Sequence, residues 1–494
     1  MKKYKEEILV FQIFLITTSA IILTKNLNNL DEVWIFNTAR NIANGLLPYK
    51  DFNLVTTPGL PIFCGMILKI FGTEMFIMRI MAIIINSLIM FVIYKILKTF
   101  EIKKEFSLLI SIIIMRLFME SMCIDYNFLI MLLALITLYI EIKAYKQNNN
   151  IFEYNLKKEI LLGTLAGLSI TMKQTTGICF VIAFIGYKLL AVRNKQDLKL
   201  FLKIAVTRFL VCMLPVIILL IYLLCNNIMN EFIDYAIWGI KNFSNSISYL
   251  NLLKGKLSIL AILVPITIII SLYISIRKNN HIITILFAYS VSTIVVVYPI
   301  SDNVHFLIAG TITIITGIYL LKELYENKFK GILEKSIIIW IENFMKALIL
   351  ILILIMIGVS TYKLINYIIN FKEYTSLENF KYIPVSKELE EQIIKVDNYI
   401  EKQENDVYIV DARAAIYMIP INRYNKNYDM FLKGNIGSKG SKGIIEDLQS
   451  KENITLLILK DKRSLNWQTP IDVIEYIQNK YEITGEIERF EIWN

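Results

Sequence analysis

Long hydrophobic runs alternate with short polar loops along most of the chain. The clearest runs cover residues 8–24, 75–97 and 347–362, and about 17–25 helical residues cross a hydrocarbon core. Further runs cover residues 106–118, 126–142, 160–190, 204–225, 257–276, 282–299 and 306–321. The run at 160–190 is too long for one span and is interrupted at 172–175, so it predicts a hairpin. The pattern therefore predicts an all-α polytopic bundle of about eleven spans.

Lysine and arginine collect in alternate loops between these runs. They occupy residues 2–5, 98–104, 143–158, 195–203 and 277–278, and such loops stay on the cytoplasmic side of a membrane. An odd number of spans then places the two termini on opposite sides. We expect the N-terminus in the cytoplasm and the C-terminal part of the chain outside it, in a multi-pass protein of the cell membrane.

The first outer loop contains two short amphipathic segments. In residues 30–46, an apolar stripe lies opposite a polar side formed by Asn37, Arg40, Asn41 and Asn44. Gly45 and Pro48 are typical of the end of a helix. Residues 59–72 are apolar but short. Both segments are predicted to be helices that lie in the bilayer interface.

The composition changes at residue 363. Short apolar strands are expected at 407–411 and 454–460, with helices at 386–403, 442–451 and 470–481. Alternation of strands and helices is typical of a small α/β domain. We therefore predict two domains, a transmembrane domain at 1–362 and an extracytoplasmic domain at 363–494.

Composition supports a membrane protein and excludes other classes. Of the 494 residues, 56% are hydrophobic and only 19% are charged, where a soluble protein would have roughly 25% charged residues. The net charge of +10 is spread over loops that flank spans, so nucleic acid is not an expected partner. The five cysteines have no metal-binding spacing and are expected to pack in the membrane.

Carboxylates near the predicted outer surface are the first candidates for chemistry. Asp31 and Glu32 open the first amphipathic segment, and Asp125 lies between the third and fourth spans. Asp31 and Asp125 could each simply cap a helix. Alternatively, a carboxylate beside apolar surface can act as a general base toward a hydroxyl nucleophile, and acids so close to a bilayer tend to be functional.

Two other polar positions interrupt apolar sequence on the same side. Lys173 sits at the break of the predicted hairpin, where it could bind a phosphate or simply extend toward the interface. Asp302 and His305 lie in a polar stretch between two spans. They could bind a metal, but two ligands are too few to define a site, and Asp302 could instead cap the next span.

In these motifs, taken in this order, the chain resembles the polyprenyl-phosphate-sugar-dependent glycosyltransferases of the GT-C fold, of the protein-mannosyltransferase and aminoarabinose-transferase type. The resemblance is carried by DEVWIFNTARNIANGLLPYKDF with TTPG, by GLSITMKQTTG and by YPISDNVHF. TTPG departs from the double proline of many relatives. The resemblance covers most of residues 1–320.

The resemblance implies roles for particular residues. Asp31 would be the catalytic base, with Glu32 beside it and Asp125 as a second acid, and Lys173 would bind the donor phosphate. Substrate-binding roles would fall to Arg40, Tyr49, Asp51, Asp302 and His305.

The expected function is transfer of a sugar from a polyprenyl phosphate to an extracytoplasmic hydroxyl on a glycan, lipid or protein. No cofactor is expected, although a divalent metal is possible. Two other functions are compatible with the sequence, a transporter or flippase of lipid-linked glycans and a non-catalytic envelope scaffold. The absence of a visible internal repeat disfavours the transporter.

Overall fold

The structure is a computed structural model that describes residues 2–27, 30–243, 247–278, 280–298, 300–326, 335–460 and 470–494. Contacts divide the chain into two compact units, each built from separate segments. Unit 1 contains residues 1–23, 81–217 and 247–368, and unit 2 contains residues 24–80, 218–246 and 369–494. The two units are described separately below.

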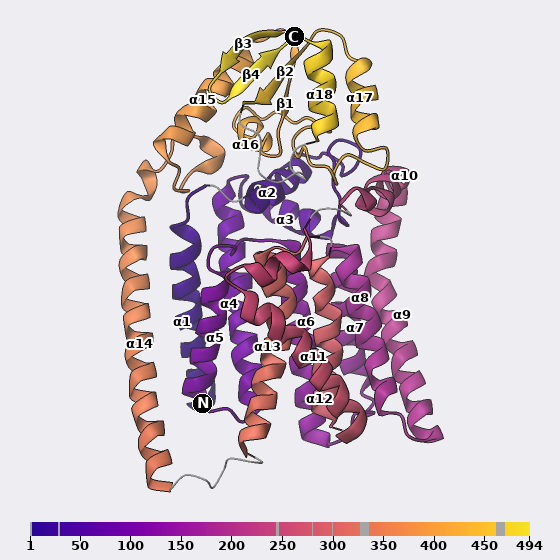
Figure 1. Ribbon diagram of the computed structural model, residues 1–494, viewed down its shortest axis with the longest axis vertical. Coiled ribbons are helices and arrows are strands. Elements are labelled where there is room, and N and C mark those ends of the chain that lie inside the picture. The colour runs from indigo at the N-terminus through magenta and orange to yellow at the C-terminus, as the bar shows by residue number, and fades with distance from the viewer. Residues whose placement is uncertain are drawn as a thin grey trace. The chain divides into compact units, whose positions relative to one another are not determined.

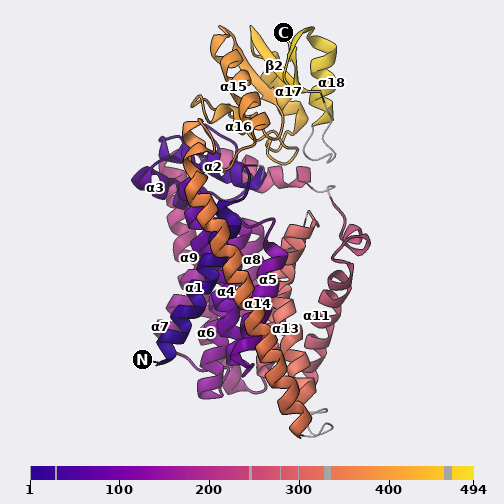
Figure 2. The ribbon, with the colours of Figure 1, turned by 90° about the vertical axis from the view of Figure 1, so that its left-hand side faces the viewer.

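Unit 1 is a bundle of long helices that run side by side (Figures 1 and 2). All eleven predicted spans are helices in the structure, and eight of these helices are long and apolar enough to cross a membrane. One of the eight is counted from Gln174 through the 3₁₀ turn that follows it, to Ala191. The three shorter predicted spans have 15, 17 and 14 residues. The eleven helices are α1 (Lys2–Leu23), α4 (Met75–Thr99), α5 (Lys104–Phe118), α6 (Tyr126–Asn148), α7 (Leu156–Met172), α8 (Gln174–Gly186), α9 (Lys195–Cys225), α11 (Ser258–Lys278), α12 (His281–Ile294), α13 (Asn303–Leu324) and α14 (Lys335–Asn370).

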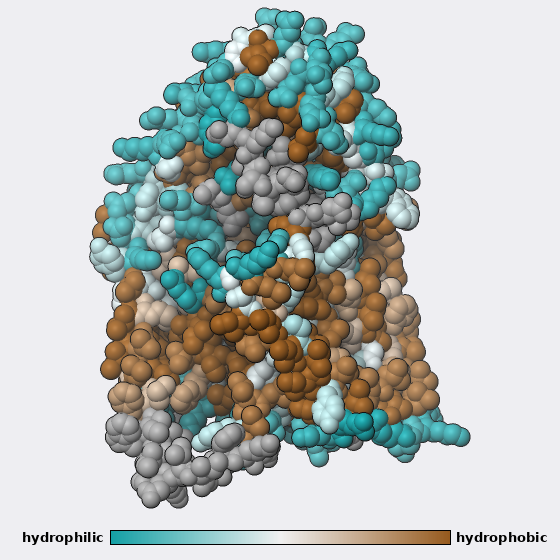
Figure 3. All heavy atoms as spheres, viewed as in Figure 1, coloured by the Kyte–Doolittle hydropathy of each residue, from teal (hydrophilic) through white to brown (hydrophobic). Residues whose placement is uncertain are grey.

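The outside of this bundle is hydrophobic. Figure 3 shows hydrophobic residues over most of the bundle surface that faces the viewer. Helices α9, α11 and α14 leave most of their apolar residues exposed. An apolar exterior of this extent is unstable in water and suits a hydrocarbon environment. The predicted polytopic membrane fold is therefore confirmed.

The predicted hairpin at 160–190 is also present. Helix α7 ends at Met172 and α8 begins at Gln174, with Lys173 alone between them in an extended conformation. The two helices pack closely where they meet, because a Cβ on Gly177 would lie 2.5 Å from the backbone of Ile170. A side chain at Gly177 would therefore push the hairpin apart.

Unit 2 contains a four-stranded sheet formed by the C-terminal part of the chain. Strands β1 (Asp406–Val410) and β2 (Ile454–Leu459) are parallel, whereas β4 (Phe490–Trp493) is antiparallel to both β2 and β3 (Ile483–Ile487). The strand order is β1-β2-β4-β3. Helix α15 (Lys387–Lys402) lies on the opposite side of the sheet from α17 (Ser441–Gln449) and α18 (Ile471–Lys480), as Figure 1 shows. The short helix α16 (Ala415–Met418) follows β1.

Unit 2 also contains the predicted amphipathic helices of the first loop. Helix α2 (Leu30–Ala43) is followed by Gly45 with φ of 89°, as expected for a glycine that ends a helix. Helix α3 (Gly59–Phe71) leaves Met66, Ile70 and Phe71 exposed. The short helix α10 (Met229–Phe232) belongs to the segment that follows α9. The predicted boundary at residue 362 remains a prediction, since unit 2 combines the C-terminal sheet with residues 24–80 and 218–246.

One departure from the sequence analysis concerns the polar side of α2. Asn37, Arg40 and Asn41 are all buried, at 3%, 2% and 0% exposure. Arg40 donates hydrogen bonds to the Ile419 carbonyl and to Asn422. The polar side of α2 is therefore covered by the C-terminal segment of the same unit and does not face solvent.

A network of buried charges ties the helices of unit 1 together. Arg208 of α9 forms ion pairs with Glu141 of α6 and Glu159 of α7, and all three side chains are almost fully buried. Arg208 also donates to the Phe184 carbonyl at 2.9 Å, and Lys188 lies 3.8 Å from Glu141. Lys158 lies 3.4 Å from Glu159 as well, so three cations surround the two carboxylates.

Removing Arg208 should strongly destabilise unit 1. Arg208→Met leaves the two buried carboxylates without their guanidinium contacts, with only Lys188 and Lys158 still near them, and breaking such a buried pair costs roughly 3–5 kcal/mol. We expect a large loss of folded protein and a lower unfolding temperature in detergent. Lys199→Gln, at an exposed position of the same helix, is the matched control. Adding Glu159→Gln should recover part of the loss. An Arg208→Met protein as stable as the control would show that the network contributes no net stability.

Candidate functional site

One end of the unit 1 bundle brings together several of the predicted site residues. Asp125 caps α6, where its side chain accepts a hydrogen bond from the Asn127 amide at 2.7 Å. Lys173, at the break between α7 and α8, donates to the Asn127 side chain at 3.1 Å and lies 4.7 Å from the centre of the Tyr126 ring. Residues from two separate loops therefore meet around the start of α6.

His305 and Asp302 extend this cluster from the start of α13. Asp302 caps α13 by accepting from the His305 amide at 2.8 Å, and its carboxylate also contacts the His305 ring at 2.9 Å. The cap interpretations of Asp125 and Asp302 are thus confirmed as local contacts. Capping does not exclude a second role for either carboxylate.

The charges of these groups influence one another. Burial raises the pKa of Asp125, while the Lys173 ammonium, the backbone amide of Asn127 and His305 act in the opposite direction. Burial would also raise the pKa of Asp302, but its interactions with His305 outweigh this effect and lower it. The site therefore combines a buried carboxyl group, Asp125, with a lysine, a second carboxyl group and a histidine that are partly exposed.

An apolar groove runs along α11, α12 and α13 of the same unit. It has a volume of about 670 Å³ and is lined mainly by isoleucine, leucine and valine. Helix α11 contributes along most of its length, whereas α13 contributes only its second half, residues 313–324, and α12 contributes Ile283. Such a groove suits a long hydrocarbon chain rather than a polar molecule.

The acidic pair that begins α2 lies in unit 2, and its two members have different surroundings. Asp31 is exposed in the first helical turn. Glu32 is buried and forms a double contact with Arg79 at 2.9 and 3.2 Å, while Arg79 also donates to the Lys25 carbonyl. The Glu32–Arg79 pair therefore anchors the turn that presents Asp31.

The remaining predicted residues of the first loop also make internal contacts. The Tyr49 hydroxyl donates to the Thr56 carbonyl at 2.6 Å, and Asp51 accepts from the Leu47 amide at 2.7 Å. Tyr49 has φ of 67° and is fully buried. These contacts fix the loop between α2 and α3. Roles of Tyr49, Asp51 and Arg40 in substrate binding remain predictions.

Three contributors to these sites were missed by the sequence analysis. They are Arg79, Asn127 and Asp429, which partner Glu32, Lys173 and Asn37 respectively. Arg79 could have been found, because a charge inside an apolar run signals a buried partner. Within the ranges that the structure describes, no group of three or more His, Cys, Asp or Glu side chains could hold a metal.

Asp429 is a buried carboxyl group that lies against α2. It accepts from the Asn425 amide at 2.9 Å, contacts Asn37 at 3.5 Å and is 3% exposed. Burial raises its pKa to about 7, despite these hydrogen bonds and the charge of Arg40. The pKa of an aspartate in the unfolded chain is about 4. At pH values between about 4 and 7, the folded protein therefore keeps Asp429 protonated, whereas the unfolded protein has lost that proton.

The stability of unit 2 should consequently fall as pH rises from about 4 through 7, because folding then has to bury an ionised Asp429. Unfolding temperatures measured across this range should decrease, and Asp429→Asn should weaken the dependence. Glu475→Gln, at an exposed site, serves as the control. Some dependence near pH 8 should persist, since burial also raises the pKa of Asp397 to about 8. An unchanged profile in Asp429→Asn would contradict the assignment.

Comparisons with known proteins agree with this architecture. The profile of the family described as dolichyl-phosphate-mannose-protein mannosyltransferase matches residues 55–222, which is less than half of the chain. A search of curated protein sequences found no match.

Solved structures match over nearly the whole chain. ArnT from Cupriavidus metallidurans, solved with bound undecaprenyl phosphate, matches with a TM-score of 0.58 and 10% identity over 98% of this chain and 97% of that one. The oligosaccharyltransferase of Archaeoglobus fulgidus, solved with zinc and sulfate, matches with a TM-score of 0.54 and 12% identity over 91% of this chain and 68% of that one. The chain therefore has the GT-C fold of membrane glycosyltransferases, as its motifs predicted.

Proposed function

We propose that this protein is an integral membrane glycosyltransferase that moves a sugar from a polyprenyl phosphate to a hydroxyl group on the outer side of the membrane. The matched family is described by a dolichyl-phosphate sugar, and a structural relative was solved with undecaprenyl phosphate. In this proposal the N-terminus is cytoplasmic and the C-terminal sheet is extracytoplasmic.

The observation that carries the proposal is the position of Lys173. Its ammonium group lies at a helix break beside Asn127, Tyr126 and the buried Asp125. A fixed cation at the end of a membrane bundle suits a lipid phosphate, because the headgroup stays at the surface while the chain enters the bilayer. The apolar groove along α11–α13 has the chemistry to hold such a chain.

The reaction in this proposal is a direct displacement at the anomeric carbon. Asp31 accepts the proton of the acceptor hydroxyl, and the hydroxyl oxygen forms a bond to the anomeric carbon. The bond from that carbon to the phosphate oxygen breaks, and its electron pair leaves with polyprenyl phosphate. Lys173 offsets the charge that develops on the departing phosphate.

The other residues hold these groups in place. The Glu32–Arg79 pair fixes the turn that carries Asp31, and Tyr49 and Asp51 shape the loop that follows. Asp125 and Asn127 orient Lys173. His305, held by Asp302, supplies a polar group at the same end of the bundle and could contact the donor sugar.

Lys173→Gln should weaken donor binding more than acceptor binding. Loss of a charge-assisted contact typically costs about tenfold or more in affinity. The measurement is the apparent KM for polyprenyl-phosphate sugar in proteoliposomes, compared with the KM for the acceptor. Lys157→Gln, at the exposed opposite end of α7, is the control. An unchanged donor KM would remove Lys173 from the donor site.

Asp31→Asn should abolish most of the turnover while leaving the protein folded. As a residue of the first helical turn, Asp31 contributes only about 0.3–1 kcal/mol through the helix dipole. As a general base, it contributes roughly 10²–10⁴-fold to the rate. Sugar transfer and donor binding should be measured together, and only transfer should fall.

Asp472→Asn is the matched control for Asp31→Asn, because Asp472 is also an exposed acid in the first turn of a helix of unit 2. It should have nearly normal activity. A transporter or scaffold would tolerate both changes equally. Asp31→Asn activity within a few-fold of wild type would contradict the catalytic assignment.

A further inference from the structure

A polar cavity lies at the edge of the sheet in unit 2. It has a volume of about 250 Å³ and lies at the carboxyl ends of the two parallel strands, since Asp411 follows β1 and Leu459 ends β2. In open α/β sheets, ligands bind outside the carboxyl ends of parallel strands. The donor groups described above, Lys173 and His305, belong to unit 1, so this cavity is not part of that cluster.

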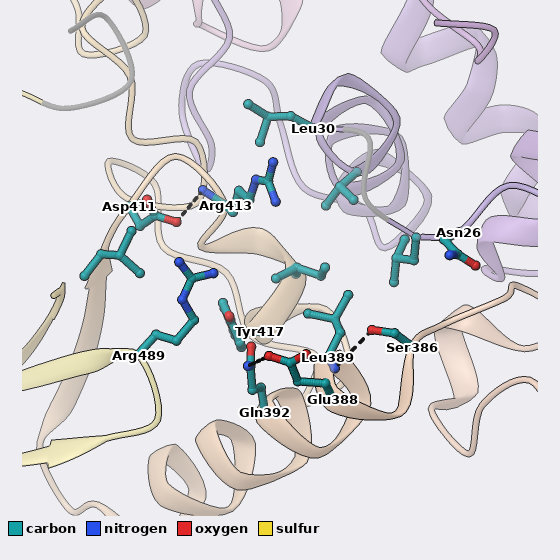
Figure 4. A pocket seen from close by; sticks show the side chains of 14 residues that line it. Asn26, Leu30, Ser386, Glu388, Leu389, Gln392, Asp411, Arg413, Tyr417 and Arg489 are labelled. Atoms are coloured by element: carbon teal, nitrogen blue, oxygen red, sulfur yellow. Dashed lines mark hydrogen bonds between the residues drawn. The ribbon is translucent and has the colours of Figure 1, made fainter. Parts of the chain in front are cut away.

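The side chains around the cavity supply both donors and acceptors. Figure 4 shows Arg413 and Arg489 reaching into the space between the loop after β1 and the first turns of α15. Asp411 accepts from the Arg413 amide at 3.0 Å, and Gln392 donates to Glu388 at 3.3 Å. Two guanidinium groups thus share the cavity with two carboxylates.

This balance of charge selects among ligands. A phosphate-binding site would carry an excess of positive charge. Here the two arginines and two acids among the described lining residues leave no net formal charge. A neutral ligand rich in hydroxyl groups is better matched, because each hydroxyl can donate to a carboxylate and accept from a guanidinium.

The cavity also contains an aromatic ring. Tyr417 lines it and is held by an edge-to-face contact with Phe490, with ring centres 5.3 Å apart. An aromatic ring offers an apolar surface beside polar groups, which matches the apolar face of a sugar ring. The volume is below the roughly 300–1,000 Å³ of typical small-molecule sites, as expected for a single small unit such as one sugar ring.

The cavity lies beside the turn that carries the proposed base. Leu30 and Val33 of α2 form part of its wall, and Asp31 belongs to the same helical turn. One turn of helix rises about 5.4 Å, and Asp31 itself does not line the cavity, so an acceptor larger than the unit held here would have to extend around this turn to reach Asp31.

We propose that this cavity is a saccharide subsite that holds one sugar unit of the acceptor, so that the acceptor is a glycan. The inference rests on the proposed function only in naming the bound sugar as part of the acceptor. Arg413 and Arg489 donate to its hydroxyl groups, Asp411 and Glu388 accept from them, and Tyr417 contacts the ring. None of these residues takes part in the chemical step.

The test measures, by saturation-transfer NMR, whether simple glycosides bind the full-length protein in detergent. The probes are the methyl glycosides of mannose, glucose, galactose, rhamnose and N-acetylglucosamine. At least one glycoside should bind both wild type and Asp31→Asn, which lacks the proposed base. Arg489→Gln should weaken binding about tenfold or more, because it removes a charged donor. Tyr417→Phe and Gln392→Ala should weaken it less. Lys442→Gln, at an exposed position of α17, should bind normally.

Unfolding temperatures identify variants that fail to fold. Tyr417→Phe keeps the ring and Gln392→Ala keeps a good helix former, so these two remain informative if Arg489→Gln is unstable. Absence of glycoside binding, or binding that none of the folded variants weakens, would overturn the inference. Inorganic phosphate binding that depends on Arg489, without glycoside binding, would also overturn it. Because no donor is present, glycoside binding stands or falls independently of transfer activity.

Discussion

Pairing of buried charge is the constraint on which this structure depends. A charge that enters apolar surroundings is costly unless an opposite charge or a hydrogen bond accompanies it. Arg208 satisfies this requirement by contacting two acids on two other helices. The contacts connect α6, α7 and α9 in one arrangement, whereas the aliphatic side chains around them could pack in several.

The same requirement shapes the proposed site. Helix ends carry unsatisfied backbone groups, and the chain places polar side chains there. Asp125 and Asp302 each satisfy a helix start, and Lys173 occupies the single-residue break of a hairpin. Polar chemistry therefore gathers where helices begin and end, while the helices hold it in a fixed position. In unit 2, the Glu32–Arg79 pair holds Asp31 in a comparable way.

Much of the architecture could be predicted from local sequence. Apolar runs located the eleven helices of the bundle, because burial in a hydrocarbon core requires apolar residues over a set length. Gly45 marked the end of α2, and the interruption at Lys173 marked the hairpin. The strands β3 and β4 were not predicted. Strand β3 is largely exposed, so its sequence lacks the buried pattern of β1 and β2, and it is stabilised by pairing with β4.

The sequence by itself determined the membrane class, the helix positions and the resemblance to a glycosyltransferase fold, since these depend on residues close together in the chain. The tertiary structure alone decided which groups meet. Periodicity distinguished the polar side of α2 but could not show that residues 419–429 cover it. Nor could it pair Glu32 with Arg79, or bring Lys173 to Asn127. Such contacts join residues distant in sequence, and only packing of the whole chain brings them within hydrogen-bonding distance.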